Sequence, residues 1–338
     1  MTDLVAPAPL VEVTRNGVVE SVHYGHVAVA NYKGEILKGA GDVNTITYPR
    51  SAMKPIQALA LIESGAAKAF NLDPKHICLA CASHWGEPYH IETVRDWLGM
   101  IDCTEEDLTC GHDFPINVDE MEKILAGGGK RERIYHNCSG KHAGFLTLAR
   151  HLGHDLDYGN FDHPVQKTYR ENLSILIDAD ADGLNWGIDG CTLPAPALPL
   201  GLMATAFARL SAPSVLDNAK KMAALTIFDA ISQEPNYLWG TDGPGSDIVR
   251  LTRGRVIAKI GAEGYMAAAD RQSGLGIALK ISDGARRPVC VALIGVLEEL
   301  GMLHDEEIKA LDMHHRPPVA NSGGEIVGEL RAASKILG

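Results

Sequence analysis

Short runs of β-branched apolar residues dominate the first fifty positions of the chain. These runs predict strands over residues 11–14, 18–22, 26–32 and 44–48. Asn16-Gly17 between the first two runs is typical of a tight hairpin turn. After Pro49 the apolar spacing becomes helical, and we expect a helix that begins near Ser51 and stops at Gly65. Ser51 is therefore predicted to lie where a strand passes into a helix.

The middle of the chain, from about residue 70 to 235, has a mostly helical pattern. Apolar residues at 145, 148, 149 and 152 follow the i, i+3, i+4, i+7 spacing and predict a helix that ends at Gly153. Strands return over residues 255–260, 275–281 and 324–330, with helices at about 286–301 and 305–312. This order predicts one α/β enzyme, in which residues 1–65 and 238–338 form a sheet domain and residues 66–237 form a mainly helical lobe.

Composition and charge narrow the class of protein. The chain has 338 residues, of which 46% are hydrophobic. Its formal net charge of −12 repels phosphate groups, which argues against nucleic acid as a partner and favours a small molecule. Apolar runs break well short of the roughly 20 residues that span a membrane, and residues 1–7 do not resemble a secretory signal. The seven scattered cysteines are typical of a reducing compartment, so we expect a cytoplasmic protein.

Ser51 and Lys54 form the most informative pair of polar residues in the sequence. Residues three apart on a helix share one face, so the spacing brings the hydroxyl and the amine together. A lysine that burial keeps neutral can accept the serine proton and make the hydroxyl a nucleophile. The same spacing is the nucleophile motif of penicillin-binding proteins and class A β-lactamases. A solvated Ser and Lys on the first turn of a helix is the alternative interpretation.

Other segments carry groups that could transfer protons or bind a metal. Cys78 and Cys81 have redox-motif spacing, but their apolar surroundings favour buried, inert thiols. The Ser83-His84 pair that follows is either a loop cap or a second active-site hydroxyl. His136-Asn137-Cys138-Ser139-Gly140-Lys141-His142 and Asp189-Gly190-Cys191 contain thiols, amines and imidazoles. From the residues alone, His142 would be the expected metal ligand, while helix capping by Ser139 and core thiols are the alternatives.

Five motifs, taken in sequence order, resemble the L-asparaginase II family of the Rhizobium etli type. The motifs are Pro49-Arg50-Ser51-Ala52-Met53-Lys54-Pro55-Ile56-Gln57, Cys81-Ala82-Ser83-His84-Trp85-Gly86-Glu87, Asn137-Cys138-Ser139-Gly140-Lys141-His142, Asp189-Gly190-Cys191 and Gly261-Ala262-Glu263-Gly264. The resemblance implies a fold like that of serine β-lactamases and penicillin-binding proteins, with an antiparallel sheet flanked by helices. It also implies L-asparaginase activity, which releases L-aspartate and ammonia from L-asparagine, and a homodimer.

The resemblance implies two Ser–Lys tandems, Ser51 with Lys54 and Ser83 with a lysine from a late strand. Lys259 is the expected partner of Ser83, because Lys259-Ile260-Gly261 stands where a Lys-Thr-Gly strand would lie. Lys280 is the alternative partner. Ser51 is the expected nucleophile, and Ser83 either relays a proton to the leaving amine or is itself the nucleophile.

A metal site, typically zinc, is also implied by the resemblance, with Cys138, Lys141 and Cys191 as ligands together with a water. This set replaces His142 as a ligand, so that His142 and Asp189 become groups that orient ligands or substrate. Whether zinc is catalytic or only positions the substrate stays open.

Charge complementarity suggests how a zwitterionic substrate would be held. Arg50 is the candidate for the α-carboxylate of L-asparagine, and Glu263 is the candidate for its α-ammonium. The sequence leaves open how far glutamine is also used. Rival interpretations are a serine hydrolase of the β-lactamase or D,D-peptidase type, a zinc amidohydrolase in which Ser51 only positions substrate, and an amino-acid sensor without catalysis.

Overall fold

The computed structural model describes residues 5–338 and separates into two compact units, which we describe one at a time. The sheet unit holds the described residues up to Ala52, with Ala197–Val215 and Asp247–Gly338. The helical unit holds Met53–Pro196 and Leu216–Ser246. Compared with the predicted domain ranges, residues 53–65 and 238–246 lie with the helices, and residues 197–215 lie with the sheet.

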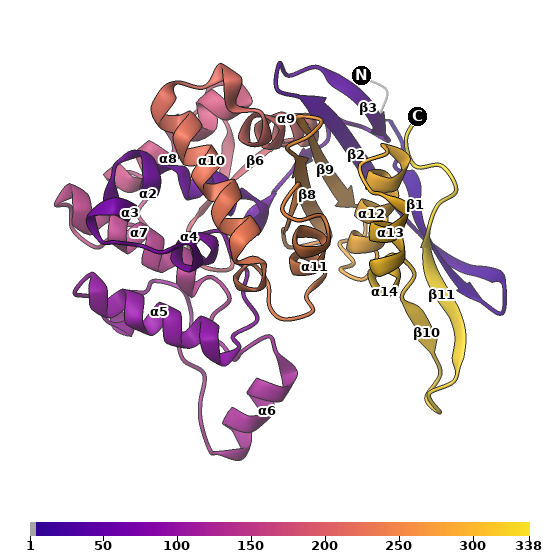
Figure 1. The fold of residues 1–338 in the computed structure, drawn as a ribbon, viewed down its shortest axis with the longest axis horizontal. Helices are drawn as coiled ribbons and strands as arrows, with labels where there is room; N and C mark the ends of the chain where they lie inside the picture. Colours follow the sequence, from indigo (N-terminus) through magenta and orange to yellow (C-terminus); the bar gives the residue numbers. More distant parts are fainter. Residues whose placement is uncertain (1–4) are drawn as a thin grey trace. The chain divides into compact units, whose positions relative to one another are not determined.

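An antiparallel sheet forms the body of the sheet unit, in the strand order β10-β11-β1-β2-β9-β8-β7, with β3 paired to β2 (Figure 1). The strands come from both ends of the chain: β1 (Ala8–Arg15), β2 (Val18–Asn31), β3 (Ile36–Ala40), β7 (Val256–Ile260), β8 (Tyr265–Asp270), β9 (Leu275–Ile281), β10 (Pro318–Ala320) and β11 (Ile326–Ala332). The prediction of an antiparallel sheet built from both chain ends is confirmed.

Two details of the sheet differ from the sequence prediction. The runs 18–22 and 26–32 join into the single strand β2, because Gly25 continues the ladder opposite Ile281. A Cβ at Gly25 would lie 2.3 Å from the carbonyl oxygen of Lys280, so glycine is required there and interrupts the β-branched pattern. Strand β8 was not predicted, because three of its six residues are alanines, which carry no β-branch.

Helices cover the sheet within its own unit. Helix α9 (Leu200–Ser211) packs on β2, β8 and β9, and α12 (Val289–Glu299) packs on β1, β8, β9 and β11. A Cβ at Gly276 of β9 would lie 2.0 Å from the Ala204 carbonyl oxygen, which shows how closely α9 approaches the strand. Every residue of β8 is buried as a result. The other elements are α13 (Asp305–Ala310), α14 (Asp312–His315), the 3₁₀-helix η3 (Pro213–Val215), and β4 (Ile46–Thr47), which pairs with β6 (Pro194–Pro199).

The helical unit is arranged around α7 (Ser139–Leu152), whose residues from Ser139 to Ala149 are all buried. Helix α7 packs against α2, α3, α4, α5 and α8, and it ends at Gly153 in the left-handed conformation, as predicted. The unit contains α1 (Lys54–Gln57), α2 (Leu59–Glu63), α3 (Ala66–Ala69), α4 (Pro74–Ala80), α5 (Pro88–Met100), η2 (Glu105–Asp107), α6 (Val118–Ala126), α8 (Pro164–Ile177), β5 (Asn185–Ile188), α10 (Asn218–Gln233) and η4 (Pro235–Tyr237). Helix α11 (Pro244–Leu251) begins there as well.

None of the helices in residues 5–338 is both long enough and apolar enough to cross a membrane.

The close packing of α7 on α4 gives a prediction about stability. A Cβ at Gly140 would lie 2.6 Å from the Leu79 carbonyl oxygen, whereas a Cβ at Gly144 would meet Ala80 Cβ at 3.4 Å. We expect Gly140→Ala to lower the free energy of unfolding by about 1–3 kcal/mol through overpacking. Gly144→Ala should be neutral or stabilising, because alanine favours a helix by about 1 kcal/mol over glycine. Urea denaturation of both variants measures the difference, and equal stability would contradict the close approach.

Candidate active site

Lys54, the first residue of α1, is fully buried and has two hydrogen-bond partners in the loop that follows α4. Its Nζ donates to the carbonyl oxygen of Ala82 and to Ser83 Oγ, the second at 3.0 Å. Pro55 in the first turn sets the helix start. The structure therefore joins Lys54 to Ser83, which lies 29 positions further along the chain. The sequence predicts these two residues in different tandems, Lys54 with Ser51 and Ser83 with Lys259.

Ser51 and Arg50 lie in the 3₁₀-helix η1 (Arg50–Met53), immediately before α1, so the predicted strand-to-helix position of Ser51 is confirmed. Both side chains are half-buried, and Arg50 has a positive φ of 53°. A Cβ at Gly261 would lie 2.3 Å from the Pro49 carbonyl oxygen. The end of β7 therefore passes directly beside the segment that carries Arg50 and Ser51.

Lys259, Glu263 and Lys280 surround the turn between β7 and β8. Lys259 is buried in β7, and its Nζ donates to the Ile260 carbonyl oxygen at 2.9 Å. Lys280 Nζ donates to the carbonyl oxygens of Glu263 and Ile281 at 2.7 and 2.6 Å, and burial lowers the Lys280 pKa. Lys280 thus fixes the backbone of the turn, while the Glu263 side chain is exposed.

The Ser83–Trp85 segment is held by main-chain hydrogen bonds to two other parts of the helical unit. Ser83 and Trp85 donate to the carbonyl oxygens of Leu238 and Trp239, at 3.0 and 2.6 Å. His84 donates in the opposite direction, to the Asn137 carbonyl oxygen at 3.2 Å. This alternation has the pattern of a strand and fixes the Ser83 hydroxyl relative to the start of α7.

The His84 ring adds a side-chain connection to α7. His84 is buried, and its Nε2 lies 2.9 Å from Ser139 Oγ. Burial, followed by the neighbouring His90, lowers the His84 pKa well below its usual value, so the imidazole is neutral. Ser139 was predicted to cap α7, but Cys138 is the N-cap residue and the Ser139 hydroxyl bonds to His84 instead.

Cys138, Lys141 and Cys191 lie together at the start of α7, all three buried. Lys141 Nζ donates to Cys191 Sγ at 2.8 Å. A hydrogen bond between the two thiols lowers the pKa of Cys138 and raises that of Cys191. Burial opposes the charged form of Lys141, but the adjacent sulfur atoms outweigh burial and raise its pKa. The structure brings together the three residues that the resemblance assigns as metal ligands.

The donor set of this thiol cluster, Cys138, Lys141 and Cys191, suits zinc in chemical type. Thiolate sulfur is a preferred zinc ligand. The Lys141 nitrogen can complete the set only when it gives up the proton that the adjacent sulfur atoms stabilise. Within residues 5–338, no three His, Cys, Asp or Glu side chains are grouped so that they could hold a metal ion. A metal at this cluster would therefore depend on the Lys141 amine as its third protein ligand.

His142 and Asp189 border the thiol cluster on different sides. His142 is buried, and its Nδ1 lies 2.8 Å from the Tyr158 hydroxyl and 3.2 Å from Thr109 Oγ1. Burial and the charge of Lys141 lower the His142 pKa, so this ring is neutral as well. Asp189 lies in a turn after β5, half-buried, and its charge helps to raise the pKa values of Lys141 and Cys191.

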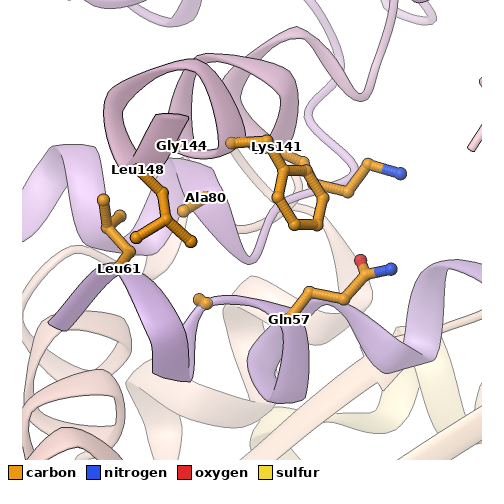
Figure 2. Close-up of a pocket in the computed structure, with 8 residues that line it drawn as sticks. Gln57, Leu61, Ala80, Lys141, Gly144 and Leu148 are labelled. Atoms are coloured by element: carbon orange, nitrogen blue, oxygen red, sulfur yellow. The ribbon is translucent and has the colours of Figure 1, made fainter. Parts of the chain in front are cut away.

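Gln57, the last residue of the first family motif, lies beside the site, although the sequence analysis assigns it no role. Gln57 lines a small cavity of about 10 Å³, together with Lys141 and apolar residues of α2, α4 and α7. Figure 2 shows the Gln57 amide and the Lys141 amine extending to the same side, beyond the apolar part of the cavity. The signal was available, because Gln57 follows Lys54 by one helical turn.

Comparison with known protein families identifies the chain. A family model described as L-asparaginase II matches residues 11–332. The chain belongs to the L-asparaginase II family. Membership in the L-asparaginase II family places the protein among the hydrolases that act on amides, and it confirms the resemblance drawn from the five motifs.

Solved structures give weaker matches, and no match was found among curated protein sequences. A β-lactamase from Mycobacterium bovis is 16% identical, with 81% of this chain and 94% of that chain covered and a TM-score of 0.42. An octameric penicillin-binding protein homologue from Pyrococcus abyssi is 13% identical. The match covers 86% of the present chain and 76% of the homologue, with a TM-score of 0.34.

The hydrogen bond between His84 and Ser139 gives a second stability prediction. His84→Phe keeps an aromatic ring but leaves the buried Ser139 hydroxyl without its partner, which should cost about 1–3 kcal/mol of unfolding free energy. His84→Gln places an amide near the position of Nε2 and should retain most of the stability. Chemical denaturation compares the two variants. If the phenylalanine variant is as stable as the glutamine variant, this hydrogen bond does not contribute as described.

Proposed function

We propose that the protein is an L-asparaginase, which hydrolyses the side-chain amide of L-asparagine through a serine nucleophile activated by lysine. The buried hydrogen bond between Lys54 and Ser83, in a member of an amide-hydrolysing family, is the observation that carries the proposal. This bond places Lys54 to exchange a proton with Ser83. Ser51 is assigned as the nucleophile from its three-residue spacing to Lys54 and from the family motif, and Ser83 is the alternative nucleophile.

Ser51 acts as the nucleophile in this proposal, and Lys54, three residues later, accepts its proton. Ser51 Oγ attacks the carboxamide carbon, and the tetrahedral intermediate collapses to an acyl-enzyme as the C–N bond breaks. The proton reaches the leaving nitrogen from Lys54 through Ser83, whose hydroxyl is already hydrogen-bonded to Lys54. Ammonia departs, and water then attacks the ester by the reverse proton route to release L-aspartate.

The ends of the substrate are assigned by charge. Arg50 would pair with the α-carboxylate and Glu263 with the α-ammonium. The contact of Gly261 with Pro49 supports this assignment, because it brings the turn that carries Glu263 close to the segment that carries Arg50. Lys259 is the better candidate for the second Ser–Lys tandem, since Lys280 is engaged with the carbonyl oxygens of both Glu263 and Ile281.

Zinc is proposed at Cys138, Lys141 and Cys191, with His142 and Asp189 orienting ligands and substrate. When bound, zinc would supply Lewis-acid polarisation of a substrate oxygen. The residues themselves place a buried, polar group of sulfur and nitrogen atoms next to the Ser83 segment, which the bond between His84 and Ser139 holds in position.

Ammonia release from L-asparagine, with L-glutamine and a chromogenic β-lactam in parallel, tests the activity and the nucleophile. We expect turnover of asparagine, a loss on the order of 10⁴-fold or more in Ser51→Ala, and a loss on the order of 10²-fold in Ser83→Ala, which removes only the proton relay. Near-normal hydrolysis by Ser51→Ala would show that Ser51 is not the nucleophile. Hydrolysis of the β-lactam without release of ammonia from asparagine would refute the proposed substrate.

Metal content tests the zinc assignment independently of turnover. We expect purified protein to retain zinc, and Cys191→Ser to lose most of it, because one of two thiolate ligands is removed. Cys78→Ser is the matched control, since Cys78 is also buried but donates to the Glu234 carbonyl oxygen, away from the thiol cluster. Equal zinc content in the two variants, measured by elemental analysis after dialysis, would remove Cys191 from the ligand set.

A further inference from the structure

Gln57 has a buried amide oxygen that is not used in the proposed mechanism. The side chain is 8% exposed, and within residues 5–338 its Oε1 makes no hydrogen bond. Leaving such an acceptor unpaired inside a protein is unfavourable, because the group has lost its contact with water without replacing it. Such an acceptor has the capacity to take a hydrogen bond from a ligand, and its place in the fold decides whether a ligand can reach it.

Tyr169, which is buried in α8, is a neighbour of Gln57, because the Gln57 side chain counteracts part of the rise that burial causes in the Tyr169 pKa. Within residues 5–338 the Tyr169 hydroxyl oxygen makes no hydrogen bond, so Tyr169 does not satisfy the Gln57 Oε1 acceptor.

The placement of Gln57 puts this acceptor next to the proposed chemistry. Gln57 and Lys54 share one face of α1, one turn apart, and Lys54 contacts Ser83. On the other side, the Gln57 amide and the Lys141 amine extend in the same direction (Figure 2). Lys141 donates to Cys191, and within residues 5–338 Gln57 Oε1 makes no hydrogen bond to Lys141 or to any other group.

We propose that Gln57 is a specificity-determining residue, whose amide oxygen accepts a hydrogen bond from the carboxamide NH₂ of the substrate. This inference rests on the proposed asparaginase function and adds a substrate contact to it. Asparagine and aspartate differ only in that a carboxamide NH₂ replaces a carboxylate oxygen. An amide oxygen attracts the NH₂ group and repels the carboxylate, so Gln57 would favour the substrate over its product.

Gln57→Met tests the proposal, because methionine has a similar shape and removes the polar atoms. The measured quantities are the KM for L-asparagine and the inhibition constant of L-aspartate, both from ammonia release. We expect the KM to rise about tenfold, the effect of one lost hydrogen bond, and the inhibition constant of aspartate to stay constant or fall. The two ligands share their α-ammonium and α-carboxylate, so only a contact to the carboxamide can separate them.

Gln166→Met is the matched control, since Gln166 is also a buried glutamine of the helical unit, and its Nε2 donates to the Tyr158 carbonyl oxygen at 2.8 Å. The Gln166→Met variant should lower stability and leave unchanged the ratio of the KM for L-asparagine to the inhibition constant of L-aspartate. Parallel weakening of asparagine and aspartate in Gln57→Met would overturn the proposal, whether the cause is a contact to the α-ammonium or a purely structural role. Failure of the proposed function would instead be seen in the wild-type protein, as absence of ammonia release.

Discussion

The fully buried side chain of Lys54 imposes the main constraint on the helical unit. Removing an ammonium or amine from water costs several kcal/mol unless its N–H groups find partners. Lys54 finds them in the Ala82 carbonyl oxygen and the Ser83 hydroxyl, both just beyond the C-terminal end of α4. The start of α1 and the end of α4 must therefore stay in register, and α7 is packed against α4 so closely that Gly140 has no room for a side chain.

The Ser83–Trp85 segment transmits this constraint to the thiol cluster. Its main-chain N–H groups bond alternately to residues 238–239 and to Asn137, and the His84 ring bonds to Ser139. Cys138 and Lys141 lie on either side of Ser139 along the chain. A shift of the serine that contacts Lys54 would thus move the start of α7, so the groups proposed for proton transfer and for metal binding are parts of one rigid network.

Local signals in the sequence were sufficient for the elements but not for their contacts. The end of α7 at Gly153 and the strand-to-helix position of Ser51 were predicted, because each depends on neighbours in the chain. Strand β8 was missed, since its alanines are buried by packing under α12 and α9 and not by their own preference. The partner of Lys54 could not be derived, because Ser83 is brought to it by the packing of helices. His142 is the metal ligand expected from composition, and the structure holds its Nδ1 against Tyr158 and Thr109. Within residues 5–338 its Nε2 makes no hydrogen bond, so the prediction for His142 stays a prediction.

The two partners of Lys54 differ in a way that bears on proton transfer. A carbonyl oxygen can only accept a hydrogen bond, so the bond to Ala82 holds one N–H of Lys54 whether the side chain is an amine or an ammonium. A hydroxyl can donate or accept, so the Ser83 bond can reverse direction as Lys54 gains or loses its proton. One bond keeps the nitrogen in place while the other follows the proton. This arrangement would let Lys54 receive a proton from one hydroxyl and deliver it through another without moving, because the carbonyl fixes its position throughout.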